Sequence, residues 1–254
     1  MNKEKVSAYF RRIGMEMPAD LTPTAELLQQ VHYAHATHVP YENLDIIRHK
    51  PLSLDPEVLF EKVVTNGRGG YCFELNGLFG WLLRELGYQV EDFASRYLRG
   101  EKEIPMRRHR VLRVTCCDGS VWCCDVGIGD RCPRYPLRLE VGTEQAQCGE
   151  LYRFLKDDFL GWVLQDFFGG QWNNFYSFTE EPQLNQDFIA LSAYCEFHAD
   201  SPFFPDEIFS LKTDDGRITL DGHLYRVFTG SRFTAKKCTE EEMPWAYAQF
   251  GLKY

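Results

Sequence analysis

One of the nine cysteines in this 254-residue chain, Cys72, lies in a sequence setting that favours chemistry. It follows Gly69-Gly70-Tyr71, and the apolar residues that come after it recur at helical spacing as far as Gly87. This spacing predicts that Cys72 lies in the first turn of a buried helix. Free backbone N–H groups and the helix dipole favour a thiolate there. The alternative is a buried cysteine that only packs.

A thiolate nucleophile acts with an imidazole beside it and a third group that orients the imidazole. His109 opens one strand-like run and Asp125 ends the next, so the order cysteine, histidine, aspartate is that of a papain-like arrangement. The alternative is a histidine at a strand edge and an aspartate that only forms a turn.

Hairpin geometry by itself does not bring His109 and Asp125 together. A two-residue Asp118-Gly119 turn would place Asp125 opposite Leu112, on the other face of the sheet from His109. A three-residue loop restores the face but leaves an offset of four residues, about 13 Å. Contact would therefore need a bulge, a bend or a different strand pairing.

The elements that must position these residues change in type along the chain. Up to about residue 88 the pattern is helical, with one helix predicted over residues 24–38 and another opened by Pro56. Residues 89–198 form strand-like runs between turn residues, and residues 199–254 mix short strands with an acidic helical tail. Helices followed by strands indicate an α+β fold.

Charge and cysteine usage exclude several classes of protein. The chain has 37 acidic and 28 basic residues, a net charge of −9, which argues against nucleic-acid and anionic-membrane partners. The odd cysteine count, the lack of an apolar run after the N-terminus and the lack of a membrane-length apolar stretch predict a cytoplasmic protein with reduced thiols.

A metal site is not favoured. His32, His35 and His38 recur every three residues on a predicted helix, so they fan over about 120° and do not converge on one ion. The pairs Cys116-Cys117 and Cys123-Cys124 point to opposite faces of their strands. We therefore predict no metal.

Taken together, these motifs resemble the arylamine N-acetyltransferase family over most of the chain. The most specific match is RGGYCFELN at residues 68–76, the family's nucleophile motif. The other matching segments are YFRRIG at 9–14, PYENLD at 40–45, His109, DVGIG at 125–129 and, more weakly, SPF at 201–203 and FGL at 250–252. The chain departs from the family pattern at Tyr41, where a phenylalanine is usual, and at Ile128, where an aromatic residue is common.

The resemblance implies three domains: an N-terminal helical bundle (1–88), a central antiparallel β-barrel (89–198) and a C-terminal α/β lid (199–254). It implies that Cys72, His109 and Asp125 form the catalytic triad. Acetyl-CoA would acetylate Cys72, and an arylamine, arylhydroxylamine or hydrazine would then take the acetyl group, in a ping-pong reaction.

Binding residues follow from the same resemblance and from the aromatic residues beside the nucleophile. The residues predicted to bind the acceptor or coenzyme A are Tyr71, Phe73, Arg108, Gly127, Ile128 and Phe203. An acidic chain needs a local basic patch for the coenzyme A phosphates. The candidates are Arg107, Arg108, Lys236 and Lys237.

Three classes of function are consistent with this sequence. The first is the acetyltransferase. The second is another cysteine-triad enzyme with the same site, such as a hydrolase or an amide synthase. The third is a binding module that keeps the fold without catalysis, and the intact nucleophile motif argues against it.

Overall fold

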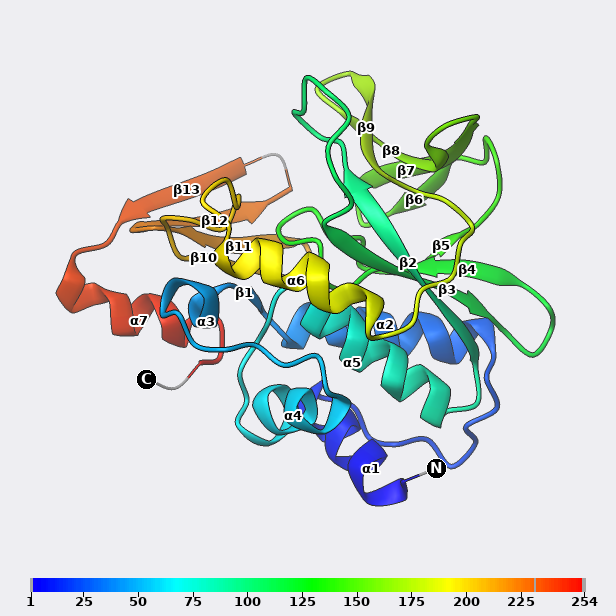
Figure 1. The fold of residues 1–254 in the computed structure, drawn as a ribbon. Helices are drawn as coiled ribbons and strands as arrows, with labels where there is room; N and C mark the ends of the chain where they lie inside the picture. The colour runs from blue at the N-terminus through cyan, green and yellow to red at the C-terminus, as the bar shows by residue number, and fades with distance from the viewer. Residues whose placement is uncertain (1, 231, 253–254) are drawn as a thin grey trace.

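The computed structural model describes residues 2–230 and 232–252. Helices make up the N-terminal part of the chain, and they lie below two antiparallel sheets in Figure 1. These helices are α1 (Lys3–Arg12), α2 (Ala25–His38), α3 (Leu44–Ile47), α4 (Pro56–Phe60) with a π-helical turn (Glu61–Thr65), and α5 (Cys72–Glu85).

Local sequence signals set the ends of these helices. Thr24 caps α2, because its hydroxyl oxygen accepts the Leu27 N–H at 3.2 Å. Pro56 is the first residue of α4, as predicted. Helix α5 begins at Cys72 and gives way to Gly87, whose φ of +90° ends it. The predicted helix start at Cys72 is therefore confirmed.

The larger sheet forms a nearly closed barrel. Its strands are β2 (Gln89–Tyr97), β3 (His109–Thr115), β4 (Val121–Cys124), β5 (Leu137–Arg138), β6 (Gln145–Gln147), β7 (Glu150–Asp157), β8 (Gly161–Phe168) and β9 (Gln171–Phe178). They pair antiparallel in the order β5-β4-β3-β2-β9-β8-β7-β6. The barrel interior is aromatic, with Phe93, Phe154 and Phe175 fully or almost fully buried.

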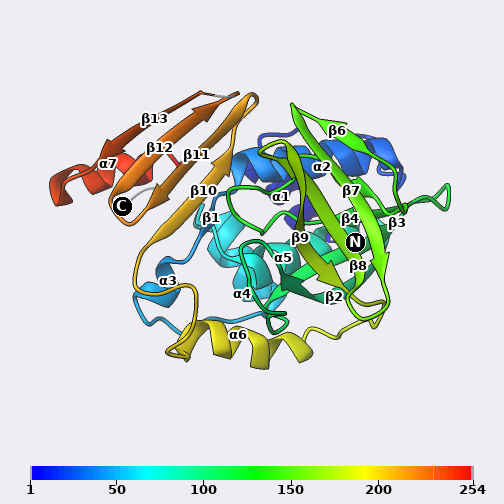
Figure 2. The ribbon, with the colours of Figure 1, turned by 90° about the horizontal axis from the view of Figure 1, so that it is seen from above.

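The second sheet contains strands from both ends of the chain. Its strands are β10 (Ile208–Lys212), β11 (Gly216–Asp221), β12 (Leu224–Thr229) and β13 (Arg232–Lys237), with β1 (Tyr41–Glu42) added at the edge beside β10. The helices of this part are α6 (Asp187–Phe197), the short turn η2 (Glu240–Glu242) and α7 (Met243–Ala248). Figure 2 shows this sheet beside the barrel, with α6 along one side of both.

The predicted α+β fold of helices, barrel and C-terminal sheet is confirmed. The domain boundaries at residues 88 and 198 stay a prediction. Strand β1 belongs to the N-terminal segment by sequence but pairs with β10, so the first and last predicted domains share one sheet.

The β3–β4 hairpin has a register that corrects the sequence-based geometry. Its loop is Cys117-Asp118-Gly119, because Cys116 N–H bonds to Ser120 O at 2.9 Å while Cys117 N–H bonds to Pro23 O instead. Leu112 then pairs with Cys124. If that register is continued, Asp125 falls opposite Val111, on the same face as His109 and about 7 Å along the strand. The predicted four-residue offset is wrong, because the three-residue loop is centred on Asp118.

Within the described ranges, no helix has the length and apolar character needed to cross a membrane.

Candidate active site

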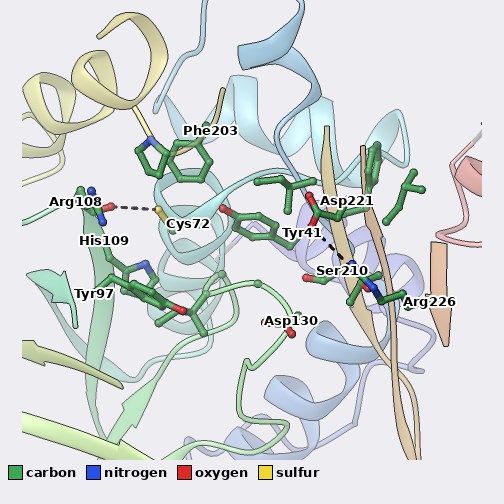
Figure 3. A pocket seen from close by; sticks show the side chains of 18 of the residues that line it. Tyr41, Cys72, Tyr97, Arg108, His109, Asp130, Phe203, Ser210, Asp221 and Arg226 are labelled. Atoms are coloured by element: carbon green, nitrogen blue, oxygen red, sulfur yellow. Dashed lines mark hydrogen bonds and ion pairs between the residues drawn. The ribbon is translucent and has the colours of Figure 1, made fainter. Parts of the chain in front are cut away.

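A cavity of about 580 Å³ lies between the barrel and the C-terminal sheet. Its wall comes from β1, β10, β11 and β12 on one side, and from β3 and residues 127–130 on the other. Cys72 at the start of α5 opens into it, and so does His109 at the start of β3 (Figure 3).

Two close contacts hold the backbone at Cys72. The Tyr71 N–H donates to the Glu74 carboxylate at 3.1 Å, and that carboxylate also pairs with Lys62 at 2.7 Å. Gly127 packs directly against the helix start, since a Cβ there would lie 2.9 Å from Cys72 Cα. Only a glycine allows this approach.

The Cys72 thiol itself is buried, with 3% of the residue exposed, and its Sγ lies 3.8 Å from the Arg108 carbonyl oxygen. Burial raises the pKa of Cys72 well above its usual value, and the negative charge of Asp125 raises it further. The backbone N–H of Phe73 lowers it only in part.

The expectation that the helix start alone favours a thiolate is therefore wrong. The negatively charged Glu74 side chain already accepts a hydrogen bond from one N–H group at the helix start, that of Tyr71. The cost of desolvating the sulfur is larger than the stabilisation that the remaining N–H groups give to a thiolate. A thiolate at Cys72 needs a cation beside it.

His109 and Asp125 are in direct contact. His109 Nε2 lies 2.7 Å from Asp125 Oδ2, and both residues are buried. Because Nε2 faces the carboxylate, Nδ1 is the nitrogen left for the cavity that His109 shares with Cys72. The structure thus brings the three predicted triad residues to one place, while their catalytic roles stay a prediction.

Three residues hold Asp125, and the sequence analysis gave none of them this role. Asn76 Nδ2 donates to Asp125 Oδ1 at 2.9 Å, and the Gly127 N–H donates to the same oxygen at 3.0 Å. His32 Nε2 accepts the Asp125 backbone N–H at 3.3 Å. Asn76 could have been noticed as a polar residue inside an apolar helix, one turn after Cys72.

His32 is a structural histidine in this arrangement. It is fully buried, its Nδ1 contacts the Arg134 carbonyl oxygen at 2.9 Å, and burial lowers its pKa to about 4. The ring is therefore neutral, so Nδ1 donates and Nε2 accepts. Among the described residues, no three histidine, cysteine or acidic side chains are grouped as metal ligands would be.

Of the predicted binding residues, Arg108, Gly127, Ile128 and Phe203 line the cavity. Tyr71 and Phe73 are not among its lining residues, and their part in binding stays a prediction. Both are fully buried, and Phe73 packs against Phe188 of α6. Successive helical residues point about 100° apart, so the neighbours of Cys72 face the core when its sulfur faces the cavity.

Of the candidates for phosphate binding, only Arg108 lines the cavity, and it pairs with Glu101. Arg107 donates to Thr179 Oγ1 at 3.0 Å outside the cavity lining. Lys236 and Lys237 lie on β13, which is the outer strand of the second sheet.

The PYENLD segment builds one end of the cavity. Tyr41 lines it, and Glu42 pairs with Arg68 at 2.7 Å. Asn43 holds the loop before β10, because its side chain donates to the Phe203 carbonyl and accepts the Ile208 N–H at 2.7 Å. The motif was recognised in the sequence. Its contacts could not be predicted, because they join residues that are far apart in the chain.

A helical part, a β-barrel and a sheet that meet around a buried cysteine and a histidine–aspartate pair define an enzyme of the acyl-transfer class. The family model described as N-acetyltransferase matches residues 24–253. A curated relative, the arylamine N-acetyltransferase of Mycobacterium bovis, is 39% identical over 222 residues, which is 85% of this chain and 77% of the relative. The enzyme of Salmonella typhimurium, named arylamine N-acetyltransferase / N-hydroxyarylamine O-acetyltransferase, is 32% identical over 96% of this chain and 88% of its own.

Solved structures agree with these relatives. The arylamine N-acetyltransferase structure from Salmonella typhimurium has a TM-score of 0.91 at 30% identity, covering 98% of this chain and 91% of that one. The Mycobacterium marinum enzyme in complex with CoA has a TM-score of 0.88 at 31% identity, covering 97% and 92%. The chain belongs to the arylamine N-acetyltransferase family and is an acetyltransferase.

Proposed function

We propose that this protein transfers an acetyl group from acetyl-CoA to an arylamine, arylhydroxylamine or hydrazine through an acetyl-Cys72 intermediate. The observation that carries the proposal is the 2.7 Å contact of His109 Nε2 with Asp125 Oδ2, in a residue pair whose histidine shares a cavity with Cys72. The CoA complex of the Mycobacterium marinum relative supports coenzyme A as the carrier of the acetyl group.

The first step is a proton transfer from Cys72 Sγ to His109 Nδ1. Burial makes an isolated thiolate costly, so the thiolate forms together with the imidazolium. Asp125 stabilises the imidazolium through Nε2, and Asn76 keeps the carboxylate in place.

The Cys72 thiolate then attacks the carbonyl carbon of the acetyl thioester. A bond forms between Sγ and this carbon, and the bond from the carbon to the coenzyme sulfur breaks. The imidazolium gives its proton to the departing thiolate, so coenzyme A leaves as a thiol. Backbone N–H groups at the start of α5, where the helix begins at Cys72, would donate to the developing oxyanion.

The second half-reaction uses the same groups in reverse. The acceptor nitrogen attacks the acetyl-Cys72 carbon, the Sγ–carbon bond breaks, and neutral His109 takes the proton from the nitrogen. Transfer of this proton to Sγ restores the thiol. The first half-reaction, by contrast, exchanges one thioester for another and is nearly balanced in energy, so its catalysis depends on positioning.

Mass spectrometry tests the intermediate. Incubation with acetyl-CoA should add one acetyl group to wild type at Cys72, and Cys72→Ala should lose both this addition and arylamine acetylation. The matched control is Cys117→Ala, which removes an exposed cysteine on the hairpin loop and should keep both. Acetylation of an arylamine by Cys72→Ala would refute the proposal, and hydrolysis of amides without acetyl-CoA would favour the hydrolase alternative.

A further inference from the structure

The chain carries the dipeptide asparagine–glycine twice, and the two copies lie in opposite surroundings. Asn66-Gly67 lies between the π-helical turn and the nucleophile motif, and Asn76-Gly77 lies inside α5. The carboxamide of an asparagine can react with the backbone nitrogen of the residue that follows it. A glycine in that place leaves the approach open, because it has no Cβ. The two copies therefore place the same chemical group in two structural settings.

The first copy, Asn66-Gly67, has the freedom that this reaction needs. The Asn66 side chain is exposed and has no hydrogen-bond partner within residues 2–230 and 232–252. Within the same ranges the Gly67 N–H has none either. Asn66 has a ψ of −2°, so its Cα–C bond must rotate before the Gly67 nitrogen can reach Cγ. Gly67 has a φ of +68° and open space around it, which permits this rotation.

The second copy, Asn76-Gly77, is held in place. Asn76 is fully buried, and its Nδ2 donates to the Arg110 carbonyl at 2.6 Å and to Asp125 Oδ1 at 2.9 Å. Its Oδ1 accepts the Val126 N–H at 2.9 Å. Gly77 lies inside α5, where the backbone N–H groups are bonded within the helix. A reaction at Asn76 therefore needs the helix to open first.

We propose that Asn66 is a deamidation site, at which the protein changes its own main chain. The Gly67 nitrogen bonds to Asn66 Cγ, the Cγ–Nδ2 bond breaks, and the Gly67 proton leaves with Nδ2 as ammonia. Water then opens the resulting imide at either of its carbonyl carbons. Opening at Cγ gives aspartate. Opening at the main-chain carbonyl carbon gives isoaspartate, in which the main chain runs through Cβ and Cγ and is one atom longer.

The main chain after Asn66 is held by close contacts on its way to the proposed nucleophile. Arg12 of α1 donates to the Arg68 carbonyl oxygen at 3.1 Å. A Cβ on Gly69 would lie 2.1 Å from the Pro40 carbonyl oxygen, so these two backbones touch. Isoaspartate at position 66 lengthens the chain directly before these contacts. We therefore expect isoaspartate to displace the nucleophile and inactivate the enzyme, whereas aspartate, which keeps the ordinary backbone, does not.

Mass spectrometry of the whole protein, incubated at mildly alkaline pH with a thiol reductant and then digested, tests the site. Deamidation at Asn66 should be at least about tenfold faster than at Asn76, because the buried helix must open before Asn76 can react. Asn66→Gln should show no reaction at position 66. The matched control is Asn174→Gln, which replaces an exposed asparagine followed by phenylalanine and should leave the rate at Asn66 unchanged. Equal rates at Asn66 and Asn76, or no reaction at Asn66, would overturn the inference.

The activity measurement tests the consequence, and only this part rests on the proposed function. Acetylation of an arylamine by wild type should fall in proportion to the isoaspartate content and stay constant in Asn66→Gln. The isolated isoaspartate form should be about 10²-fold less active, because a displacement of about 1 Å at the reacting centre has that effect. Asn66→Asp should act as fresh wild type.

Enzymatic repair separates this change from other damage to the protein. Protein isoaspartyl methyltransferase with S-adenosylmethionine returns isoaspartate to aspartate, so it should restore the activity of incubated wild type. An isoaspartate form with full activity would overturn the proposed inactivation. Absence of arylamine acetylation by fresh wild type would instead refute the proposed function, and the mass measurement would still decide the site.

Discussion

The reactivity of Cys72 depends on its neighbour more than on its place at a helix start. Burial and nearby negative charge raise the pKa of the thiol, and the Glu74 carboxylate occupies part of the helix terminus. The imidazole of His109 is the group that can take the proton, and Asp125 decides which ring nitrogen is free to do so. At the scale of residues, the site is therefore a buried cysteine and a histidine whose orientation is fixed by hydrogen bonds through Asp125 and Asn76.

Asp125→Asn should lower kcat/KM for acetylation by about 10³- to 10⁴-fold. An amide donates its N–H to His109 Nε2, which forces the proton onto Nδ1 and removes the base that faces Cys72. Burst measurements of acetyl-Cys72 formation check this result. Asp158→Asn, at an exposed hairpin position, is the control and should act as wild type. A variant that acetylates at the wild-type rate would contradict the proton path.

Acidification should weaken the fold through His32. Its pKa is about 4 in the folded state and near 6.5 when unfolded, so the unfolded chain binds the proton more readily between these values. The stability contributed by neutral His32 is complete above pH 6.5 and is lost as the pH falls towards 4, by up to ~3 kcal/mol. Denaturant unfolding at several pH values measures the slope.

His32→Gln should flatten this slope but not abolish it, because burial also lowers the pKa of His35. His198→Gln replaces a half-exposed histidine and should keep the wild-type slope. An unchanged slope in His32→Gln would show that protonation of this ring does not limit stability.

At the scale of elements, the site exists where a helix start and a loop of the barrel touch. Gly127 follows β4 and lies against Cys72 so closely that a methyl group would meet the helix backbone and, at 3.1 Å, Asn76 Nδ2. The loop at residues 125–129 and helix α5 thereby fix the positions of the aspartate and the cysteine relative to each other.

Gly127→Ala should lower kcat/KM by about 10²-fold, because a displacement of about 1 Å at the reacting centre has that effect. Steady-state kinetics measure the loss of activity, and a melting curve measures any change in the stability of the fold. Gly80→Ala in α5 is the control, since its added methyl group meets mainly the mobile end of Arg84, at 3.1 Å. Equal activity in Gly127→Ala and Gly80→Ala would argue against the conclusion that the packing of residue 127 fixes the position of Cys72.

At the scale of the whole molecule, the cavity depends on how the barrel and the second sheet are held together. Glu150 on β7 of the barrel pairs with Lys212 on β10 at 2.9 Å and with Arg134 at 3.0 Å. Lys212 and Arg134 are both buried, and Arg134 also donates to the Thr213 carbonyl at 2.9 Å. This cluster joins the two walls of the cavity.

Glu150→Gln should lower the free energy of unfolding by about 2–4 kcal/mol, because it leaves two buried cations without their carboxylate. Thermal and denaturant unfolding measure the loss, and Lys212→Met in the same background should recover part of it. Glu140→Gln breaks an exposed pair with Arg138 and should change stability by less than about 1 kcal/mol. Similar losses of stability in Glu150→Gln and Glu140→Gln would contradict the conclusion that Glu150 joins the barrel to the second sheet.

Some features followed from the sequence because their physical causes are local. The start of α5 at Cys72 and its end shortly before Gly87 depend on helical spacing and on a glycine with positive φ, which are readable within a few turns. The start of α4 at Pro56 is of the same kind. The α+β class and the family motif around Cys72 were also readable in the sequence alone.

Other features were decided only by the tertiary structure, because they join residues far apart in the chain. The register of the β3–β4 hairpin puts Asp125 on the same face as His109, and Cys117 in its loop bonds to Pro23, which is far away in the chain. The direction in which Cys72 faces puts Tyr71 and Phe73 in the core instead of the cavity. The pairing of β1 with β10 brings Tyr41 into the cavity wall. The periodicity of a sequence shows which side of a helix or strand is buried. Strand register and tertiary packing determine which residues from elsewhere in the chain lie against that side.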